Sequence, residues 1–470
     1  MRLSRRRFLK SAALGGGGVL AGSAALNAVS PLIWHEPAPL DVNTSFWARS
    51  QAPLNPPLSH DLTVDVAVVG GGLTGLSSAY YIRRASPEKS VAVLEARGCG
   101  NGASGRNGAM VLTMTADRFM SFSAHPAVDK SIYDLTAGNI RAMAALGAAM
   151  GLDCELDTPG TLQVFDSVAD ASAAAAYVRQ ARSLGMPVEC WDAARLAAAI
   201  GTEAYLGGFY DPNGGHVHPM KLVRVFKLAA ESAGASIYES TPVEHIEEGQ
   251  VNALGTGNGH FVLAKSLVLA SNAFTPSLGF LRNSILPIRE YVGITRPLSA
   301  EEIGAIGWRS RAPFNDSKTE LYYFGLTREG RIHIGGGPPE YRFDNGPADP
   351  RDLDSKRRRL RAELLRVFPK LAGVELELTW NGVIDWSLDA APAVGRTGRF
   401  RNVFYAIGFS GHGVNLSSVF GRIIADLEAG REQAWSRYPF VNAHLGYVPN
   451  EPFRWIGAEA GLAWYGLTRR

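Results

Sequence analysis

Short apolar runs alternate with glycine-rich and polar segments along much of the chain. The runs at 64–69 and 91–94 are apolar at nearly every position, which is typical of strands buried on both faces of a parallel sheet. Helices are predicted over 73–84, 133–150, 169–184, 220–233, 352–368 and 415–428. This order of strands and helices predicts an α/β fold with a Rossmann-like unit near its start.

A different pattern occupies the middle of the chain. A strand is predicted over 161–165, a strand end over 294–298, and a hairpin over 321–326 and 331–336 around Glu329-Gly330. The blocks 131–217 and 281–378 are therefore predicted to form a second, inserted α+β domain. The run Arg357-Arg358-Arg359-Leu360-Arg361 lies on the helix of 352–368, where apolar residues recur at helical spacing, so we interpret it as a solvated face.

The first 30 residues have the pattern of an export leader. Ser4-Arg5-Arg6-Arg7-Phe8-Leu9-Lys10 precedes an uncharged run over 11–29 and resembles a twin-arginine signal. A membrane anchor is the alternative, although the run consists mainly of small residues and is only weakly hydrophobic. The signal predicts a periplasmic or otherwise exported protein that passes through the twin-arginine machinery. It also favours a tightly held redox cofactor.

Charge and cysteine content narrow the class of protein. The chain has 470 residues and a formal net charge of +3. Five of its 47 basic residues and none of its acids lie in the leader, leaving 42 basic against 44 acidic residues, so nothing indicates a nucleic-acid partner. The cysteines Cys99, Cys154 and Cys190 have no zinc-ligand spacing, and we predict no metal site.

The strand at 64–69 leads into a dinucleotide-binding fingerprint. Gly70, Gly72 and Gly75 form G-x-G-x-x-G at the start of the helix over 73–84. The helix N-terminus would face a pyrophosphate. The next strand ends in Glu95, 25 residues beyond Gly70, where an acid can accept ribose hydroxyls.

The loop that follows distinguishes flavin from nicotinamide. The segment 97–110, Arg-Gly-Cys-Gly-Asn-Gly-Ala-Ser-Gly-Arg-Asn-Gly-Ala-Met, resembles the "GASGRNGG" segment of the FAD-dependent D-amino-acid oxidase superfamily, with Ala109 in place of the usual second glycine. The likeness is greatest to the branch of amine oxidoreductases that resemble gamma-glutamylputrescine oxidoreductase. It implies an FAD-binding domain split by an inserted domain whose antiparallel sheet covers the flavin ring.

Later segments resemble the same superfamily. They are Thr241-Pro242-Val243, the strand ending Ala270-Ser271-Asn272, Trp380-Asn381-Gly382, and Gly408-Phe409-Ser410-Gly411-His412-Gly413-Val414. The fingerprint and the resemblance together predict these FAD-binding residues: Gly70, Gly72, Leu73, Thr74, Gly75, Glu95, Ala96, Arg97, Gly102, Ala103, Ser104, Arg106, Asn107, Gly108, Val243, Ala270, Asn272, Gly382, Gly408, Ser410, Gly411, His412, Gly413 and Val414.

The attachment of FAD is predicted to be non-covalent. Some members of the superfamily link flavin to a histidine just after the dinucleotide unit or to a cysteine in the later half. This chain has no histidine between His60 and His125, and its last cysteine is Cys190.

The resemblance also implies a division of the chain. The predicted parts are a leader (1–30), a lead-in (31–61), an FAD-binding domain (62–130, 218–280 and 379–432), the inserted domain and a tail (433–470). The tail is rich in aromatic residues, and its packing against the FAD-binding domain is expected. Peripheral membrane contact near a quinone pool is the alternative.

The implied chemistry is oxidation of a C–N bond by hydride transfer to flavin N5, giving an imine that water hydrolyses. The catalytic candidates are His412, in the turn that borders the ring, Tyr323, on the hairpin, and Asp385. Tyr322 and His333 share that hairpin, where aromatic side chains could form an amine cage or simply pack.

The residues after Trp380-Asn381-Gly382 bear on the class of substrate. No arginine follows Trp380-Asn381-Gly382, whereas Asp385 does, which favours a cationic amine over an α-carboxylate. Arg289 or Arg296 could still clamp a carboxylate. The acceptor would be oxygen or a quinone or other electron carrier. The alternatives are a flavin dehydrogenase of a 2-hydroxy acid or polyol and a non-catalytic flavoprotein; a serine hydrolase is disfavoured, because the turn at Ser410 lacks the last glycine of G-x-S-x-G.

Overall fold

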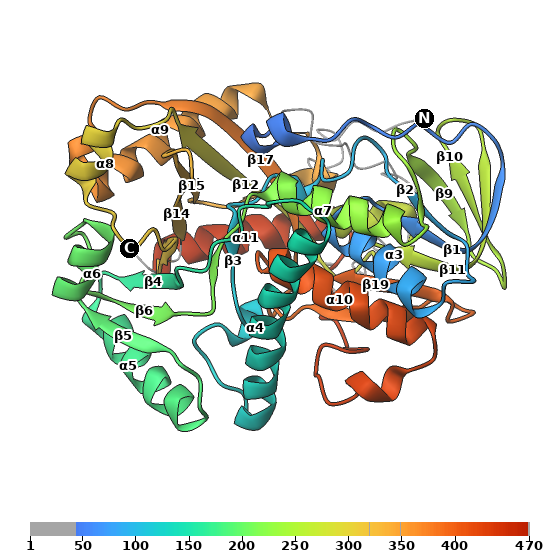
Figure 1. Ribbon diagram of the computed structural model, residues 1–470, viewed down its shortest axis with the longest axis horizontal. Helices are drawn as coiled ribbons and strands as arrows, with labels where there is room; N and C mark the ends of the chain where they lie inside the picture. The colour runs from blue at the N-terminus through green and yellow to red at the C-terminus, as the bar shows by residue number, and fades with distance from the viewer. Residues whose placement is uncertain (1–43, 319, 348, 469–470) are drawn as a thin grey trace, which may run out of the picture.

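The computed structural model describes residues 44–468, apart from 319 and 348, and the predicted leader lies outside this range. Two large sheets lie on opposite sides of the molecule, and the chain passes between them several times (Figure 1). One is an eight-stranded sheet with a parallel centre, and the other is a nine-stranded, mainly antiparallel sheet. The predicted α/β fold with an inserted α+β part is confirmed.

The eight-stranded sheet carries the dinucleotide unit. Its order is β18-β19-β11-β1-β2-β8, with β9 and β10 attached to β11. β1 pairs in parallel with β2 and β11, and β18 pairs antiparallel with β19. The bounds are β1 Leu62–Val69, β2 Val91–Leu94, β8 Ser236–Tyr238, β9 Val243–Glu247, β10 Asn252–Thr256, β11 Phe261–Leu269, β18 Ala393–Thr397 and β19 Val403–Ile407.

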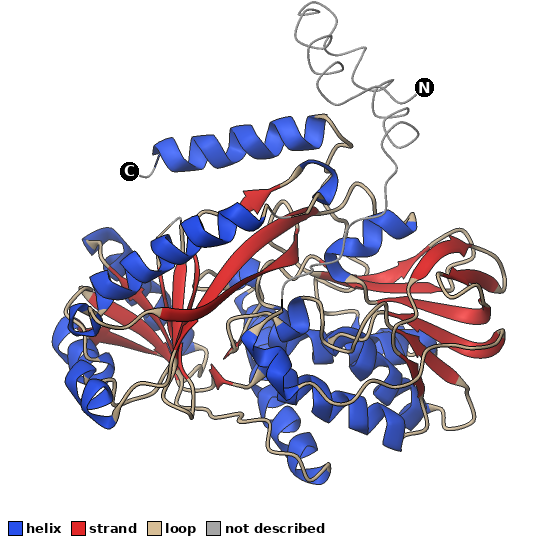
Figure 2. Ribbon diagram, turned by 90° about the horizontal axis from the view of Figure 1, so that it is seen from above, coloured by secondary structure: helices blue, strands red, loops and turns tan. Residues whose placement is uncertain are grey.

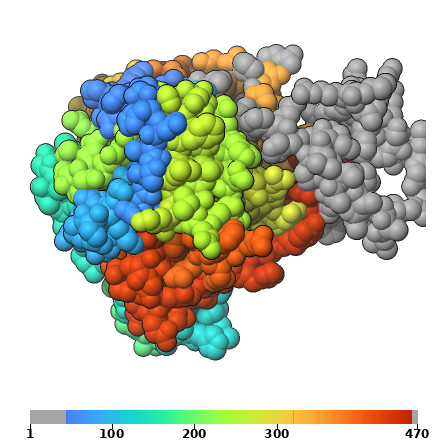
Figure 3. All heavy atoms as spheres, turned by 90° about the vertical axis from the view of Figure 1, so that its right-hand side faces the viewer, coloured from blue at the N-terminus to red at the C-terminus, as the bar shows by residue number. Residues whose placement is uncertain are grey.

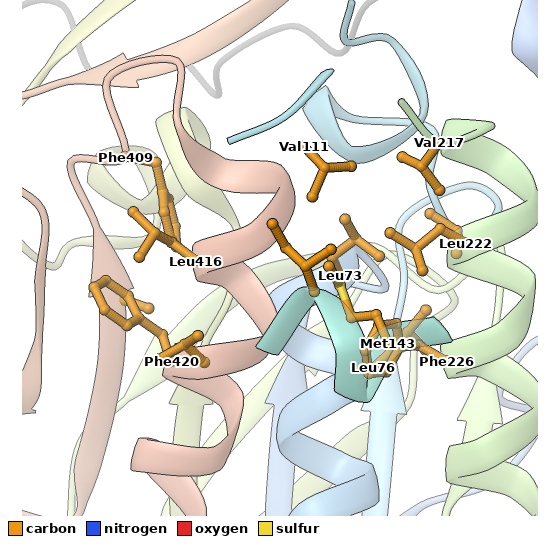
Figure 4. Packing of buried hydrophobic residues seen from close by; sticks show 14 of the residues in the cluster. Leu73, Leu76, Val111, Met143, Val217, Leu222, Phe226, Phe409, Leu416 and Phe420 are labelled. Atoms are coloured by element: carbon orange, nitrogen blue, oxygen red, sulfur yellow. The ribbon is translucent and has the colours of Figure 1, made fainter. Parts of the chain in front are cut away.

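Three helices cover one face of this sheet. They are α3 (Leu73–Ala85), α7 (Pro219–Ser232) and α10 (Gly413–Glu428). Figure 4 shows Leu73 and Leu76 of α3 between the apolar side chains of α10 and α7. α3 and α10 approach so closely that a Cβ at Gly421 would lie 2.1 Å from Ser77 Oγ, so only glycine fits there. This packing holds the N-termini of α3 and α10 at the same edge of the sheet.

The nine-stranded sheet forms the second part. Its order is β16-β12-β15-β14-β13-β4-β6-β5, and β17 pairs with β12. The bounds are β4 Thr161–Phe165, β5 Glu189–Asp192, β6 Gly207–Asp211, β12 Leu286–Thr295, β13 Phe314–Asp316, β14 Tyr322–Leu326, β15 Ile332–Gly336, β16 Glu340–Tyr341 and β17 Leu376–Trp386. Residues 379–386, assigned above to the FAD-binding part, therefore lie in this sheet, because β17 pairs with β12 along its length.

The remaining helices pack around this sheet and between the two parts. α4 (Pro126–Ala149), predicted to begin at 133 within the inserted domain, contacts α7 and α10 and contributes to their core. α5 (Val168–Ser183), α6 (Ala193–Ile200), α8 (Ala300–Ile306) and α9 (Pro350–Val367) flank the nine-stranded sheet. A short two-stranded pair, β3 (Met110–Val111) with β7 (Gly215–His216), lies between the parts.

The two ends of the described chain lie on different parts. The first turn, Phe46–Ser50, contacts α7, and the lead-in runs over the surface beside it (Figure 3). In the tail, Trp435, Tyr438 and Phe440 join the core around α10. α11 (Phe453–Thr468) instead lies outside the two sheets, near β16 (Figure 2). Over the described residues, no helix has the length and apolar character that a membrane crossing requires.

Candidate active site

A cavity of about 1630 Å³ lies between the two sheets and is lined by both. All predicted FAD-binding residues line it except Gly75, Arg97 and Gly408. The three catalytic candidates, His412, Tyr323 and Asp385, also lie on its wall. The chain thus brings together, in one cavity, segments separated by more than 300 residues in the sequence.

The glycine fingerprint forms one end of the cavity. A Cβ at Gly75 would lie 1.9 Å from the carbonyl oxygen of Gly70, so Gly75 acts by letting the helix pack on the turn and not by facing the cavity. α3 begins at Leu73 after Gly72, which provides no side-chain cap. The Leu73 amide donates to Ser104 Oγ at 2.9 Å, so the loop hydroxyl lies at the helix N-terminus. This end has the donors that a pyrophosphate requires.

Glu95 lies on the cavity wall next to the glycine fingerprint, where an acid can accept ribose hydroxyls. Its Oε2 accepts the Gly71 amide at 2.7 Å and its Oε1 accepts the Arg97 amide at 2.9 Å. Burial raises the pKa of the Glu95 carboxyl, and the two amides oppose that rise. The carboxylate is therefore oriented by backbone groups and still lines the cavity.

The loop of 102–108 is held from outside by two indoles. Trp47 Nε1 donates to the Asn107 carbonyl at 2.9 Å, and Trp380 Nε1 donates to the Arg106 carbonyl at 2.8 Å. Ser45 Oγ donates to the Gly105 carbonyl at 2.7 Å. The loop backbone is therefore fixed by residues from the lead-in segment and from β17.

The turn before α10 is organised around Asp385. The carboxylate of this buried residue accepts the amides of Gly408 at 2.6 Å and Phe409 at 3.2 Å, and it also accepts Asn272 Nδ2 at 3.2 Å. Burial raises the pKa of Asp385 to about 7. These contacts make Asp385 a positioning residue for the turn; its catalytic role stays a prediction. Gly408 lies behind the turn, whereas Ser410–Val414 line the cavity and lead into the free amides of α10.

Three residues other than glycine on the described cavity wall have left-handed backbone angles: Asn272 (φ 50°), Ala390 (φ 57°) and Ser410 (φ 47°). Ala109 (φ 58°) has the same conformation and lies between the lining residues Gly108 and Met110. Asn272 begins the short 3-10 helix after β11, Ala390 lies between β17 and β18, Ser410 lies in the turn before α10, and Ala109 lies just before β3.

His412 faces the cavity as a neutral imidazole. Burial lowers the pKa of His412 to about 4. Its Nδ1 and Nε2 have no hydrogen-bond partner among the described residues, and its ring packs on Phe119 at 5.3 Å between centroids. Both nitrogens are therefore buried without a described hydrogen-bond partner, and the residue lies on the cavity wall.

Tyr323 is the aromatic residue of the hairpin that faces the cavity. A Cβ at Gly108 would lie 2.1 Å from its Cε2, and a Cβ at Gly335 would lie 2.2 Å from its Cζ, so the ring fits between two glycines. Tyr322 faces the core on the other side of the sheet. His333 is buried against His216, with Nε2 atoms 3.1 Å apart, and does not line the cavity. Of the predicted aromatic cage, the structure places Tyr323 alone at the cavity.

The sequence analysis missed the cavity-facing row of β12. Leu286, Ile288, Glu290 and Val292 alternate along this strand, and all four line the cavity. Gln163 of β4 and Asn315 of β13 are also on the wall and were missed. The alternation of apolar residues over 286–292, interrupted by one acid, was visible in the sequence; only the end of this strand was recognised.

The candidate carboxylate clamps lie away from the cavity. Arg289 points to the opposite side of β12 and donates to Asn381 Oδ1 at 2.6 Å. Arg296 forms an exposed ion pair with Glu302 at 2.7 Å. The basic residues on the described wall are Arg106, Lys318 and Arg454.

These three basic residues have protein partners. Arg106 donates to the carbonyl of Asn381 at 3.0 Å, and Arg454 donates to the carbonyl of Arg282 at 2.6 Å. Lys318 pairs with Glu363 at 3.1 Å.

The donor set fits FAD. The fingerprint glycines and the N-terminus of α3 suit a pyrophosphate, Glu95 suits a ribose, and the N-terminus of α10, which follows His412, adds uncapped backbone amides at the cavity wall. A Cβ at Gly72 would lie 2.9 Å from Ser104 Oγ, so a side chain at this position would meet the hydroxyl that accepts the Leu73 amide.

Comparison with known proteins agrees with this geometry. The family model "DAO: FAD dependent oxidoreductase" matches residues 65–427. Gamma-glutamylputrescine oxidoreductase of Escherichia coli (strain K12) is 30% identical over 439 residues, covering 90% of this chain and 96% of the relative. Glycine oxidase of Geobacillus kaustophilus (strain HTA426) is 26% identical over 398 residues, covering 82% of this chain and 98% of the relative.

Solved structures share the fold. The crystal structure of glycine oxidase from Geobacillus kaustophilus has a TM-score of 0.70 at 24% identity and covers 83% of this chain and 100% of that chain. L-proline dehydrogenase from P. horikoshii has a TM-score of 0.65 at 20% identity and covers 82% of this chain and 98% of that chain. With a family model that spans most of its length, the chain belongs to the FAD-dependent oxidoreductases of the DAO family, which confirms the predicted cofactor and enzyme class.

Proposed function

We propose that the protein oxidises the C–N bond of an amine or amino acid. The single observation that carries this proposal is the continuity of the cavity: the FAD cradle opens directly onto the wall formed by β12, β14 and β17, with Tyr323 and His412 on it. Relatives whose names include gamma-glutamylputrescine oxidoreductase and glycine oxidase support this reaction class.

FAD, when bound, would accept a hydride at N5. The substrate would lose that hydride from carbon and a proton from nitrogen and become an imine, which water would split into a carbonyl compound and an amine or ammonia. Tyr323 would form one side of the substrate chamber, and the neutral His412 could exchange hydrogen bonds with the substrate or the ring. Asp385 would act at a distance by holding the turn that carries Ser410 and Gly411.

Anaerobic reduction of the flavin tests this function. We expect a panel of amines and amino acids to bleach the flavin absorbance of the purified enzyme, and an oxygen pulse to show whether the reduced enzyme reacts with oxygen or needs a quinone-like acceptor. Bleaching by 2-hydroxy acids or polyols alone would overturn the proposal. Absence of reduction by any small molecule would indicate a non-catalytic flavoprotein.

FAD attachment is proposed to be non-covalent. Acid precipitation should release all yellow colour into the supernatant, and colour retained in the protein pellet would contradict this. Support comes from the candidate attachment residues: no described histidine lies between His60 and His125, and Cys190 is exposed and absent from the cavity wall.

Export by the twin-arginine route is also proposed, from the sequence of the first 30 residues. Replacing Arg5 and Arg6 together by lysine keeps the charge and should leave the full-length protein in the cytoplasm. A control with Arg2 replaced by lysine should be exported normally. Export of the paired variant at the normal level would contradict the proposal.

A further inference from the structure

We propose that Glu290 binds the ammonium group of the substrate and selects amines that lack an α-carboxylate. The inference rests on the proposed amine oxidation and names its substrate class. The inference also rests on the position of the Glu290 carboxylate. It is the one acid in the apolar, cavity-facing row of β12, and it lies beside the FAD cradle and across from the Tyr323 ring.

The surroundings of Glu290 are apolar along its own strand. Ile288 and Val292 are its neighbours on the same face of β12, and all three line the cavity. Glu290 has no hydrogen bond or ion pair with any residue that the structure describes. Placing an ionised carboxylate in such surroundings is costly unless a cation pairs with it. Consistent with this, burial raises the pKa of Glu290 to about 7.

The position of Glu290 places a bound cation near the reacting part of FAD. Glu290 is opposite Gly382 in the β12–β17 pair. A Cβ at Gly382 would lie 3.2 Å from Arg106 Cβ, so this point of the sheet touches the loop of the FAD cradle. An ammonium on Glu290 would therefore lie beside the cradle and not at the outer mouth of the cavity.

Tyr323 provides the second contact surface. Cross-strand pairing aligns Val292 with Gly335 and Gly335 with Tyr323. The Tyr323 ring lies over Gly335, since a Cβ there would be 2.2 Å from its Cζ and its hydroxyl oxygen, and the ring thus extends toward β12. An aromatic face near a carboxylate suits an alkylammonium ion, which the ring quadrupole and the charge both attract.

Across the sheet from Tyr323, two polar side chains face the same cavity and could contact the rest of a substrate. Tyr323 is paired with Asn315, and Asn315 with Gln163, and all three line the cavity. Gln163 Oε1 has no hydrogen-bond partner among the described residues. A substrate anchored at Glu290 could extend along this row.

Each basic residue on the described part of the cavity wall already has a protein partner. The described basic residues that line the cavity donate to protein carbonyl groups or pair with Glu363. An α-amino acid would bring its carboxylate close to Glu290, and like charges at short distance in a buried site repel each other strongly. The geometry therefore favours a plain amine over the corresponding amino acid.

Two probes of similar shape and opposite charge test this binding site on the purified holoenzyme. Benzamidinium and benzoate would be titrated while the flavin absorption spectrum is followed, a readout that needs no turnover. We expect benzamidinium to bind more tightly than benzoate, and Glu290→Gln to weaken benzamidinium by about 10-fold or more while benzoate stays the same or binds better.

Glu320→Gln is the matched control. Glu320 is another carboxylate on the cavity wall, in the segment before β14, and its replacement removes the same charge. We expect it to leave benzamidinium binding within about 2-fold, because Glu320 lies outside β12 and its row of cavity-facing residues. Equal weakening by both variants, or tighter binding of benzoate than benzamidinium by the unmodified enzyme, would overturn the proposal. The latter comparison needs no variant to fold.

A second measurement separates this inference from the general function. Flavin reduction would be compared for the pairs 1,4-diaminobutane and ornithine, and benzylamine and phenylglycine, which differ by an α-carboxylate. Faster reduction by the plain amines supports the inference, and faster reduction by the amino acids overturns it while leaving C–N oxidation intact. Reduction by none of the four would count against amine oxidation, whereas the benzamidinium titration would still decide whether Glu290 binds a cation.

Discussion

Asp385 Oδ2 accepts the backbone amide of Gly408 at 2.6 Å, across 23 residues of sequence. Its other oxygen accepts the amide of Phe409 and the side chain of Asn272. One carboxylate thus joins the end of β17, the turn before α10 and the end of β11. The residue that the sequence presented as a substrate-binding acid is bonded to the protein on both oxygens.

Replacing Asp385 by asparagine should loosen this turn. The amide NH₂ would oppose one of the backbone donors, with a cost of about 1.5–3 kcal/mol for a hydrogen bond to a charged group. We expect a lower melting temperature and weaker FAD binding, measured by thermal unfolding and flavin fluorescence. Asp389→Asn is the control, since Asp389 is exposed and accepts one nearby amide. A loss of kcat with unchanged melting temperature and FAD affinity would instead favour a direct catalytic role.

Glu95→Gln should weaken FAD binding without unfolding the protein. Both carboxylate oxygens accept backbone amides, so a glutamine must turn a donor toward Gly71 or Arg97. We expect the dissociation constant of FAD to rise about 10- to 100-fold, as measured by quenching of flavin fluorescence. Glu244→Gln, an exposed acid at the same end of the cavity, should change it little. Equal affinities for both variants would contradict this role of Glu95.

Gly335→Ala should displace the Tyr323 ring. The new methyl group would lie 2.2 Å from Tyr323 Cζ, and Gly108 blocks movement on the other side. We expect slower flavin reduction and a stability loss of about 1–3 kcal/mol, with FAD still bound. Gly304→Ala, where a Cβ would meet nothing within 4 Å, is the control. Unchanged reduction kinetics in Gly335→Ala would show that the ring position does not matter for substrate.

His412 should not titrate near neutral pH. Its pKa is lowered to about 4 by burial, so the imidazole is neutral from about pH 5 upward. We expect His412→Asn to lower the rate of flavin reduction by about 10-fold without changing the shape of its profile from pH 5.5 to 9. His245→Asn, on the exposed strand β9, serves as control. Disappearance of a step near pH 6.5 in His412→Asn alone would contradict the assignment.

Glu290 should make the ligand-free enzyme less stable as pH rises. Its pKa is about 7 in the folded protein and about 4.3 in the unfolded chain. The folded state therefore holds more protons between these values, and stability falls as pH rises through that window. Compared with Glu290→Gln, the unmodified protein should lose stability in denaturant titrations from pH 5 to 7. Parallel pH curves for the two proteins would contradict the raised pKa.

Other titrating groups share that cavity. Besides Glu290, the charged and titratable residues that line the described cavity are Glu95, Glu244, Tyr323, Asp385, His412, Arg106, Lys318, Glu320 and Arg454. They are present in both proteins, so their own titration cancels to first order in the difference between the two curves. The difference thus reports Glu290.

The dinucleotide unit could be predicted from sequence because its determinants are local. The strand at 64–69, the glycines and Glu95 follow one another within about 30 residues, and each constrains the next. The hairpin over 322–326 and 332–336 was predicted within one residue for the same reason. The choice of FAD over a nicotinamide cofactor came from the resemblance of the loop at 97–110 to an FAD-dependent superfamily.

The substrate side could not be predicted in the same way, because it depends on pairing between distant strands. β17 contains the motif Trp380-Asn381-Gly382, which was assigned to the FAD-binding part, yet it pairs with β12, about 90 residues earlier in the sequence. The direction of Arg289 depends on the phase of β12, of which only the end was recognised. A one-residue difference in phase exchanges Arg289 and Glu290 between the core and the cavity. The hydrogen bonds of Asp385 likewise depend on the turn at Gly408 and Phe409, which lies more than 20 residues later in the sequence.

The left-handed residues Ala109, Asn272 and Ser410 carry a further consequence. For residues with a Cβ, such backbone angles are strained by about 1 kcal/mol or more each. The strain is stored on three separate segments that converge on one cavity. Selection for thermal stability alone would therefore tend to relax these positions, for example through Ala109→Gly, and would erode the preorganised shape of the cavity before it disturbed the rest of the fold.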